Sequence, residues 1–278
     1  KRALSAWAYY GSHPKSDACD DGTIKSGDAD VPLAEQDARG VTAAVYLYAL
    51  TGDKQFEDFI RKNRELTRPF KEDRWSVYEA PEGDAFLFYT TLPNANPELE
   101  KAIVERKLSQ SKNVDIYGFQ REKDQYRAFM REDSYPWGSN QARANFGSTN
   151  YDLFQYAIVS SAEAETARDR AAGVVNSFHG VNPMQLVYLT QMAPYGAERS
   201  CNEMFHTWFR DGDPRWDSAK DSEFGPAPGY VTGGPNKSYC SGDGDREHKC
   251  YDSEVRKQPA QKAYLDPDSS RSASTIAS

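Results

Sequence analysis

The chain has 278 residues, a formal net charge of −8 and 27% charged residues. This length suffices for one large hydrophobic core or for two modest ones. The acidic balance excludes a broad phosphate-binding surface, so we expect no nucleic acid partner. No apolar run is as long as a membrane span, so we also expect no membrane association. We expect no organic cofactor.

Apolar residues recur at helical spacing through the first part of the chain. Helices are predicted over residues 2–10, 33–50, 54–66, 84–89 and 96–109. The turn at Thr51, Gly52 and Asp53 is short enough to fold the second and third of these helices into an antiparallel hairpin. Strand-like alternation is scarce. The class is therefore predicted to be all-α, with helical hairpins stacked side by side.

Two long helices are predicted in the second half of the chain. One covers residues 141–160 with an interruption at Gly147, and the other covers residues 162–178. Pro183 biases Asn182 toward extended backbone and is itself pre-set for a first helical turn. Asn182 is therefore expected to cap a short buried helix over residues 184–192.

The C-terminal part has a different composition. Residues 225–236 are rich in Gly and Pro, which exclude a helix or a regular strand and leave an ordered loop or a linker. Tyr230 and the absence of Ser/Thr repeats favour the ordered loop. Residues 266–278 are Ser-rich and are predicted to be a frayed tail, so the domain is expected to cover residues 1–265.

Four motifs carry a resemblance to a known family. They are HGVNPMQLVYLTQM, YGAERSCNEMFHTWF, GPAPGYVTGGPN and QPAQKAY, in this order between residues 179 and 264. WGSN at residues 137–140 and LYALTGD at residues 47–53 point the same way. The chain resembles the C-terminal part of the catalytic domain of family 9 glycoside hydrolases, which include cellulases and endoglucanases. It is most similar to the subgroup that carries an upstream immunoglobulin-like domain.

This resemblance implies an (α/α)6 barrel, incomplete in this chain, with long ordered loops. It also implies hydrolysis of β-1,4-glucosidic bonds with inversion, which needs one carboxyl group as acid and another as base. The family's base lies in an upstream Asp-Ala-Gly-Asp motif and its acid Glu lies downstream of QPAQKAY. Neither is evident here, and the stretch DACD at residues 17–20 is similar to the base motif in composition only. No catalytic residue is therefore assigned, and we expect the C-terminal end to reflect a truncation, a frame change or natural divergence. Glu198 and Glu203 receive no catalytic role either, because the resemblance implies that acidic residues at these positions are structural.

Three side chains are candidates for contacting the substrate. His206 matches the family histidine that hydrogen-bonds the sugar beside the cleaved bond, and a neutral imidazole can do so with either nitrogen. Trp208 and Tyr195 are candidate stacking platforms, with ordinary packing as the open alternative.

An acidic cluster is the candidate metal site. Asp211, Asp213 and Asp217 surround Gly212 and form either a structural calcium loop or an exposed acidic turn. A second calcium site that the family often has in its first hairpin is not expected, because its Asp-Glu ligands correspond to Ala38 and Arg39.

The cysteines near the C-terminus allow more than one interpretation. Cys240 and Cys250 bracket a polar loop and form either a local disulfide or two free thiols. With His248 they would supply three zinc ligands without a clear fourth, which is a weak signal.

Three functions are compatible with the resemblance. The first is an endoglucanase-like cellulase acting on cellulose or related β-glucans, as polysaccharide or oligosaccharide, in a secreted or periplasmic enzyme. The second is an exo-acting glucosaminidase on chitosan oligosaccharides, which an acidic pocket would favour. The third is an inactive carbohydrate-binding fragment. An incomplete ring of hairpins would also expose apolar faces, so we expect self-association through the exposed barrel edge, a partner, or marginal stability.

Overall fold

The computed structural model describes residues 1–17, 31–72, 74–75, 77, 80–118, 125–126, 130–135, 138–203, 213–237 and 257–264. The tail predicted at residues 266–278 lies outside these residues. The chain divides into two compact units, Lys1–Asn113 and Val114–Ser278, which are treated separately below. Among the described residues, no helix has the length and apolar character needed to cross a bilayer.

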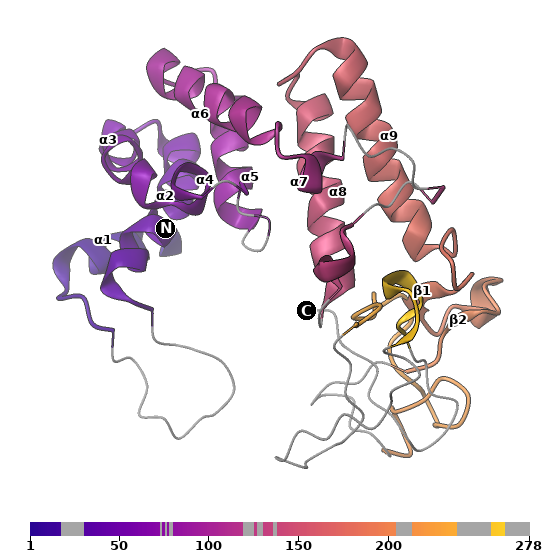
Figure 1. The fold of residues 1–278 in the computed structure, drawn as a ribbon. Coiled ribbons are helices and arrows are strands. Elements are labelled where there is room, and N and C mark those ends of the chain that lie inside the picture. Colours follow the sequence, from indigo (N-terminus) through magenta and orange to yellow (C-terminus); the bar gives the residue numbers. More distant parts are fainter. Residues whose placement is uncertain are drawn as a thin grey trace. The chain divides into compact units, whose positions relative to one another are not determined.

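The first unit is helical throughout its regular structure (Figure 1). Its elements are α1 (Arg2–Ser12), α2 (Leu33–Thr51), α3 (Lys54–Asn63), η1 (Arg64–Leu66), α4 (Arg68–Lys71), α5 (Ala80–Tyr89) and α6 (Pro97–Gln110). The five helices predicted from the sequence are all present. The largest differences are at α3, which passes into the 3-10 turn η1, and at α5, which begins four residues earlier than expected; the other helix ends agree within two residues.

The hairpin of α2 and α3 is held by local contacts at the turn between the two helices. Gly52 takes the left-handed conformation at φ 68° and its N–H donates to the Tyr48 carbonyl, which ends α2. The Asp53 side chain accepts a hydrogen bond from the Gln55 N–H and so begins α3. Phe56 and Ile60 on the inner face of α3 are buried. The predicted antiparallel hairpin is confirmed.

The second unit combines a helical hairpin with a region of loops and short strands. Its elements are α7 (Val114–Tyr117), η2 (Glu132–Ser134), α8 (Ser139–Gln155), α9 (Ser161–Phe178), β1 (Val187–Thr190), η3 (Ala193–Tyr195), β2 (Ser200–Cys201) and η4 (Ala260–Lys262). Helices α8 and α9 lie side by side, and the strands follow the C-terminal end of α9 (Figure 1).

Helix α8 is continuous, so the interruption predicted at Gly147 is wrong. A Cβ atom at Gly147 would lie 3.1 Å from Cγ1 of Val174, which shows that the glycine lets α9 approach closely and does not break α8. Helix α8 also ends earlier than predicted, at Gln155, and Ala157 follows with a positive φ of 50°. A reciprocal capping box between Ser160 and Glu163 then begins α9.

The short helix predicted over residues 184–192 is also wrong, because this segment forms strand β1. Val187 to Thr190 alternate between half-buried and buried and pair in parallel with β2 through Ser200 and Cys201. The Asn182 side chain does cap, but it accepts hydrogen bonds from the Met184 and Leu186 N–H groups of a turn. Apart from this two-stranded sheet, regular structure in the described residues is helical, as the predicted class requires.

Candidate functional site

The beginning of helix α8 binds the Gly- and Pro-rich loop that lies more than ninety residues later in the chain. The Asn140 side chain donates to the Thr232 carbonyl at 2.9 Å, and its N–H donates to the Gly233 carbonyl at 3.0 Å. The Ser139 hydroxyl donates to the Pro235 carbonyl at 2.6 Å. Because these loop residues are buried and hydrogen-bonded, the interpretation of this segment as an ordered loop is confirmed.

Strand β1 binds the other side of the same loop. The Thr190 N–H donates to the Tyr230 carbonyl at 2.9 Å, and the Thr232 N–H donates to the Tyr188 carbonyl at 2.9 Å. Leu189 and Val231 form an isolated antiparallel bridge. The loop therefore runs alongside β1 as a short, irregular continuation of the sheet.

A buried hydrophobic cluster contains residues of β1 and β2 together with Tyr264 of the last motif. Tyr188 packs edge-on against Tyr264 with ring centroids 5.2 Å apart. The thiol of Cys201 lies 3.2 Å from the Tyr264 hydroxyl, and Val174 and Phe178 of α9 complete the cluster. The four motifs that carry the family resemblance thus contribute described residues to one substructure, which we call the motif cluster.

The guanidinium of Arg143 in α8 is buried near the phenol of Tyr188 in the motif cluster. The guanidinium of Arg143, only 2% exposed, donates to the Tyr135 hydroxyl at 3.1 Å and to the Ser177 hydroxyl at 3.4 Å. The Tyr188 hydroxyl has no hydrogen-bond partner among the described residues. Burial raises the pKa of Tyr188, and the charge of Arg143 opposes this only in part. Tyr188 is therefore neutral at physiological pH and cannot act there as a base.

Of the three predicted substrate contacts, the structure places Tyr195. Its ring is 70% exposed at the end of η3, and its N–H donates to the Met192 carbonyl just after β1. An exposed ring on the motif cluster is available to stack on a ligand, although its role stays a prediction. His206 and Trp208 lie outside the described residues.

The predicted calcium site is only partly described. Asp213 accepts a hydrogen bond from the Arg215 N–H at 2.8 Å and lies 3.5 Å from the Arg215 side chain. These contacts hold the pKa of Asp213 below its usual value, and the guanidinium opposes a cation at the same carboxylate. Asp217 is half-buried, and Asp211 lies outside the described residues. Within the described part of the chain no three His, Cys, Asp or Glu residues are grouped as metal ligands.

The structure describes some of the remaining polar and cysteine residues considered from the sequence. Glu198 is exposed, whereas Glu203 is buried and its backbone forms an isolated bridge with Ser218. Cys201 is buried, and its thiol lies next to the hydroxyls of Thr232 and Tyr264. The alternatives at Cys240, His248 and Cys250 lie outside the described residues, as does most of the stretch at residues 17–20. In the first hairpin, Ala38 is buried in α2, and the Arg39 side chain lies 3.9 Å from Glu35.

Two features of the second unit were not predicted from the sequence. One is the buried guanidinium of Arg143, which nothing in the local pattern of α8 distinguishes from a surface arginine. The other is a contact between two exposed rings, Trp216 and Phe224, with centroids 4.8 Å apart. Aromatic residues in a polar segment are the signal that could have indicated this pair.

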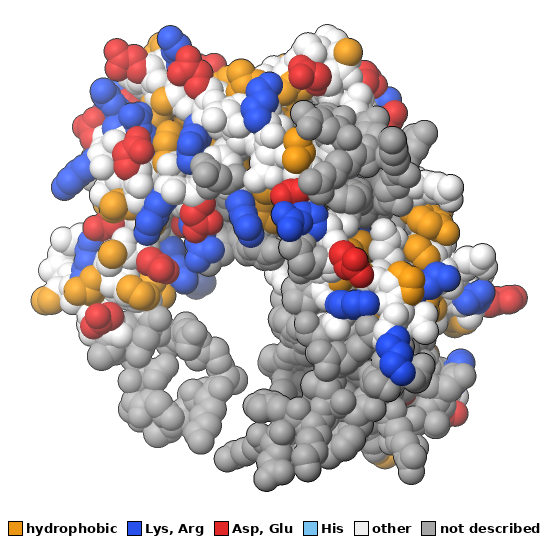
Figure 2. Space-filling view, in the orientation of Figure 1, with side chains coloured by type: hydrophobic (Ala, Val, Ile, Leu, Met, Phe, Trp, Pro, Cys, Tyr) orange, Lys and Arg blue, Asp and Glu red, His pale blue; other side chains and the backbone are white. Residues whose placement is uncertain are grey.

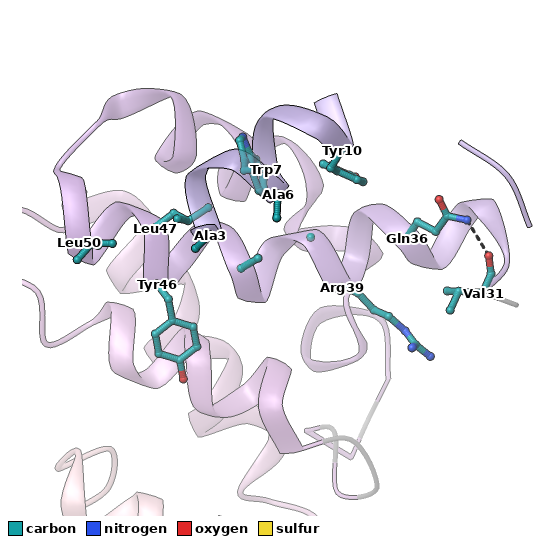
Figure 3. Close-up of a pocket in the computed structure, with 12 residues that line it drawn as sticks. Ala3, Ala6, Trp7, Tyr10, Val31, Gln36, Arg39, Tyr46, Leu47 and Leu50 are labelled. Carbon is teal, nitrogen blue, oxygen red and sulfur yellow. Dashed lines mark hydrogen bonds between the residues drawn. The ribbon is translucent and has the colours of Figure 1, made fainter. Parts of the chain in front are cut away.

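The first unit carries an apolar pocket of about 560 Å³ between α1 and α2 (Figure 3). Trp7 of α1 and Leu47 and Leu50 of α2 supply apolar walls, whereas Gln36 and Arg39 lie toward one end. With so few polar groups, the pocket suits an apolar face of another helix better than a sugar. On the face shown in Figure 2, basic and acidic side chains of this unit are interspersed.

Residues 1–277 match the model of glycosyl hydrolase family 9. The structure is similar to AaCel9A solved in complex with cellobiose-like isofagomine, at 21% identity and a TM-score of 0.65, covering 99% of this chain and 46% of that one. It is also similar to a single mutant of a thermostable endoglucanase from Alicyclobacillus acidocaldarius, at 22% identity and a TM-score of 0.66, with coverages of 99% and 46%.

A third similar structure is a metagenome-derived family 9 endoglucanase, at 20% identity and a TM-score of 0.64, with 98% of this chain and 43% of that chain covered. No curated protein matches the chain. The chain thus spans less than half the length of the solved structures it matches. The likeness confirms the fold class, helical hairpins of an (α/α)6 barrel that is incomplete in this chain. The chain belongs to glycosyl hydrolase family 9.

Proposed function

We propose that this chain is part of an endoglucanase-type glycoside hydrolase that cleaves β-1,4-glucosidic bonds in cellulose or related β-glucans, with inversion. The observation that carries the proposal is the family 9 match over residues 1–277. The endoglucanases among the similar structures favour the same substrate class. The enzyme would be secreted or periplasmic, because a cellulose chain cannot enter the cell.

In this proposal the motif cluster forms one wall of the sugar-binding site. His206 hydrogen-bonds the sugar beside the cleaved bond, and the exposed ring of Tyr195 offers a stacking surface. Trp208 is the second proposed stacking residue. Inverting hydrolysis further needs an acid and a base about 6.5–9.5 Å apart, and the resemblance assigns both to motifs that this sequence does not contain.

The experiment is reducing-sugar release from carboxymethyl cellulose and from chitosan oligosaccharides, measured for the wild-type chain and for His206→Ala. His13→Ala is the matched control, because His13 is exposed on the first unit, where it stacks on Tyr9. Activity on cellulose that His206→Ala lowers and His13→Ala leaves unchanged would support the proposal. It would also show that a working acid and base are present in this sequence.

One alternative has an observation in its favour. Because neither carboxylate motif is evident, the chain could bind β-glucan without cleaving it. Binding of cello-oligosaccharides without release of reducing sugar would establish that this chain binds β-glucan without cleaving it, and would overturn hydrolysis by this chain alone. Hydrolysis of chitosan oligosaccharides in preference to cellulose would instead establish the glucosaminidase.

A further inference from the structure

Two aromatic side chains on the second unit present exposed rings to solvent. Trp216 is 39% exposed and Phe224 is 50% exposed. Their rings contact each other with centroids 4.8 Å apart and planes tilted by 32°. Together the two rings form a small exposed apolar patch.

The backbone holds this pair in place. The Phe224 N–H donates to the Arg215 carbonyl at 2.8 Å, and the Glu223 N–H donates to the Pro214 carbonyl at 2.9 Å. These bonds join the two ends of the segment of residues 213–225 and so bring the Trp216 and Phe224 rings together. A preformed arrangement of this kind loses little conformational entropy when it binds a ligand.

The same segment is anchored to the motif cluster. The Asn202 carbonyl accepts from the Ala219 N–H at 2.9 Å, and the Asn202 side chain donates to the Ser218 hydroxyl at 2.9 Å. Asn202 follows strand β2 and stands four residues before His206 in the sequence. The rings are therefore attached to the segment that leads into the proposed sugar-contacting histidine.

The chemistry of the patch suits a carbohydrate. The C–H groups of a β-linked pyranose make an apolar face that packs on the electron-rich face of an aromatic ring. Arg215 directly precedes Trp216, and its side chain lies 3.5 Å from the Asp213 carboxylate, so this segment also carries charged groups of the kind that hydrogen-bond sugar hydroxyls. Two rings are too small an area for a stable protein interface, which needs on the order of 1,000 Å².

We propose that Trp216 and Phe224 form a stacking platform for a β-1,4-linked glucan chain, additional to the contacts expected at His206, Trp208 and Tyr195. This inference rests on the proposed function, because it takes its ligand class from it. The platform binds the glucan and takes no part in bond cleavage. It therefore acts on affinity for the chain and leaves the chemical step unchanged.

The test is isothermal titration calorimetry of the full chain with cellohexaose, and with maltohexaose as the α-linked comparison. Trp216→Ala and Phe224→Ala should each weaken cellohexaose binding roughly five- to twentyfold, as expected for removing one exposed ring face that the bound sugar would cover. Trp216→Phe should bind within about twofold of wild type because it keeps a ring. Tyr9→Ala is the matched control, since Tyr9 is 62% exposed and stacked on His13 in the first unit.

The outcomes separate this inference from the proposed function. If wild type binds or hydrolyses β-glucan while Trp216→Ala and Phe224→Ala bind cellohexaose as wild type does, the platform is wrong and the function stands. If wild type neither binds nor hydrolyses any β-glucan, both are wrong. Equal losses in Trp216→Phe and Trp216→Ala would show that ring stacking is not the cause. Should Trp216→Ala fail to fold, Phe224→Ala decides alone.

Discussion

The side chain of Asn140 lies directly against the backbone of Gly234, so that a Cβ atom at Gly234 would come within 2.4 Å of its amide group. Gly234 also has a positive φ of 82°. This contact joins the start of α8 to the Gly- and Pro-rich loop, and it leaves no room for any other residue. The position is therefore a sensitive probe of the motif cluster.

Gly234→Ala should lower the free energy of unfolding by more than the left-handed backbone alone explains. The backbone term for an L-residue is about 1–2 kcal/mol, and the steric clash with Asn140 should add about 1–3 kcal/mol. Gly229→Ala is the matched control, because Gly229 has a φ of 84° but only the Met192 sulfur 4.0 Å away. Urea unfolding followed by circular dichroism measures both. Equal losses would show that the Asn140 contact is unimportant.

Glu57 gives the first unit a pH-dependent contribution to stability. Its buried carboxylate accepts hydrogen bonds from the Tyr89 hydroxyl at 2.7 Å and from Lys54 at 2.8 Å. Burial raises the pKa of Glu57, but these hydrogen bonds outweigh it and the pKa lies below its usual value. A lowered pKa stabilises the fold above the unfolded-state value of about 4.3, and this stability is lost as the pH falls through the folded-state value.

Glu57→Gln should therefore lower the melting temperature at pH 7, by an amount that corresponds to about 1–2 kcal/mol. The difference from wild type should shrink as the pH is lowered below about 4.3. Glu65→Gln is the control, because Glu65 is exposed and pairs with Arg64 at the surface, where such pairs contribute little. A difference between Glu57→Gln and wild type that stays constant from pH 7 to pH 3 would contradict the assigned role.

How far the sequence predicted the structure depended on whether the signal was local. The α2–α3 hairpin was predictable because Gly52 and Asp53 end one helix and cap the next through contacts within a few residues. The start of α6 was predictable for the same reason, since the Asn96 side chain accepts from the Glu98 and Leu99 N–H groups. Such caps act before any tertiary contact forms.

The errors came where a distant partner decides the structure. Asn182 and Pro183 carry a helix-start signal, but the residues after them pair with β2 and with the loop around Val231, and this pairing overrides the local preference. The interruption expected at Gly147 is wrong because the glycine makes room for Val174 of α9 and does not break α8. At the candidate site the motifs located the cluster, whereas the exposure of Tyr195 and the Trp216–Phe224 contact needed the structure.

Gly147→Ala tests the close approach of α8 and α9. Alanine favours a helix interior over glycine by about 1 kcal/mol, so a stabilisation is expected wherever space permits. At Gly147 the Cβ would meet the Val174 side chain at 3.1 Å, and we expect a net loss of about 1 kcal/mol instead. Gly11→Ala in α1 is the control, because no atom lies within 4 Å of its added Cβ and it should stabilise. Stabilisation by both substitutions in thermal unfolding would contradict the packing argument.

The apolar pocket on the first unit leads to a prediction about association. Leu50 is 70% exposed and Tyr46 is 49% exposed on α2, beside the pocket that α1 and α2 enclose. An exposed apolar face of this kind is stabilised when a second copy of the chain covers it. We therefore expect concentration-dependent self-association in sedimentation velocity experiments.

Leu50→Glu should weaken this association about tenfold or more, because a carboxylate would be buried without a partner at the contact. Leu66→Glu is the matched control, since Leu66 is 44% exposed in the same unit but does not line the pocket. The two substitutions add the same charge, so a general effect of repulsion between acidic chains would weaken both equally. A specific contact through the pocket would weaken only the first. A wild-type chain that stays monomeric at every concentration and melts in one sharp cooperative transition would contradict the prediction, because its exposed apolar face would then need no cover.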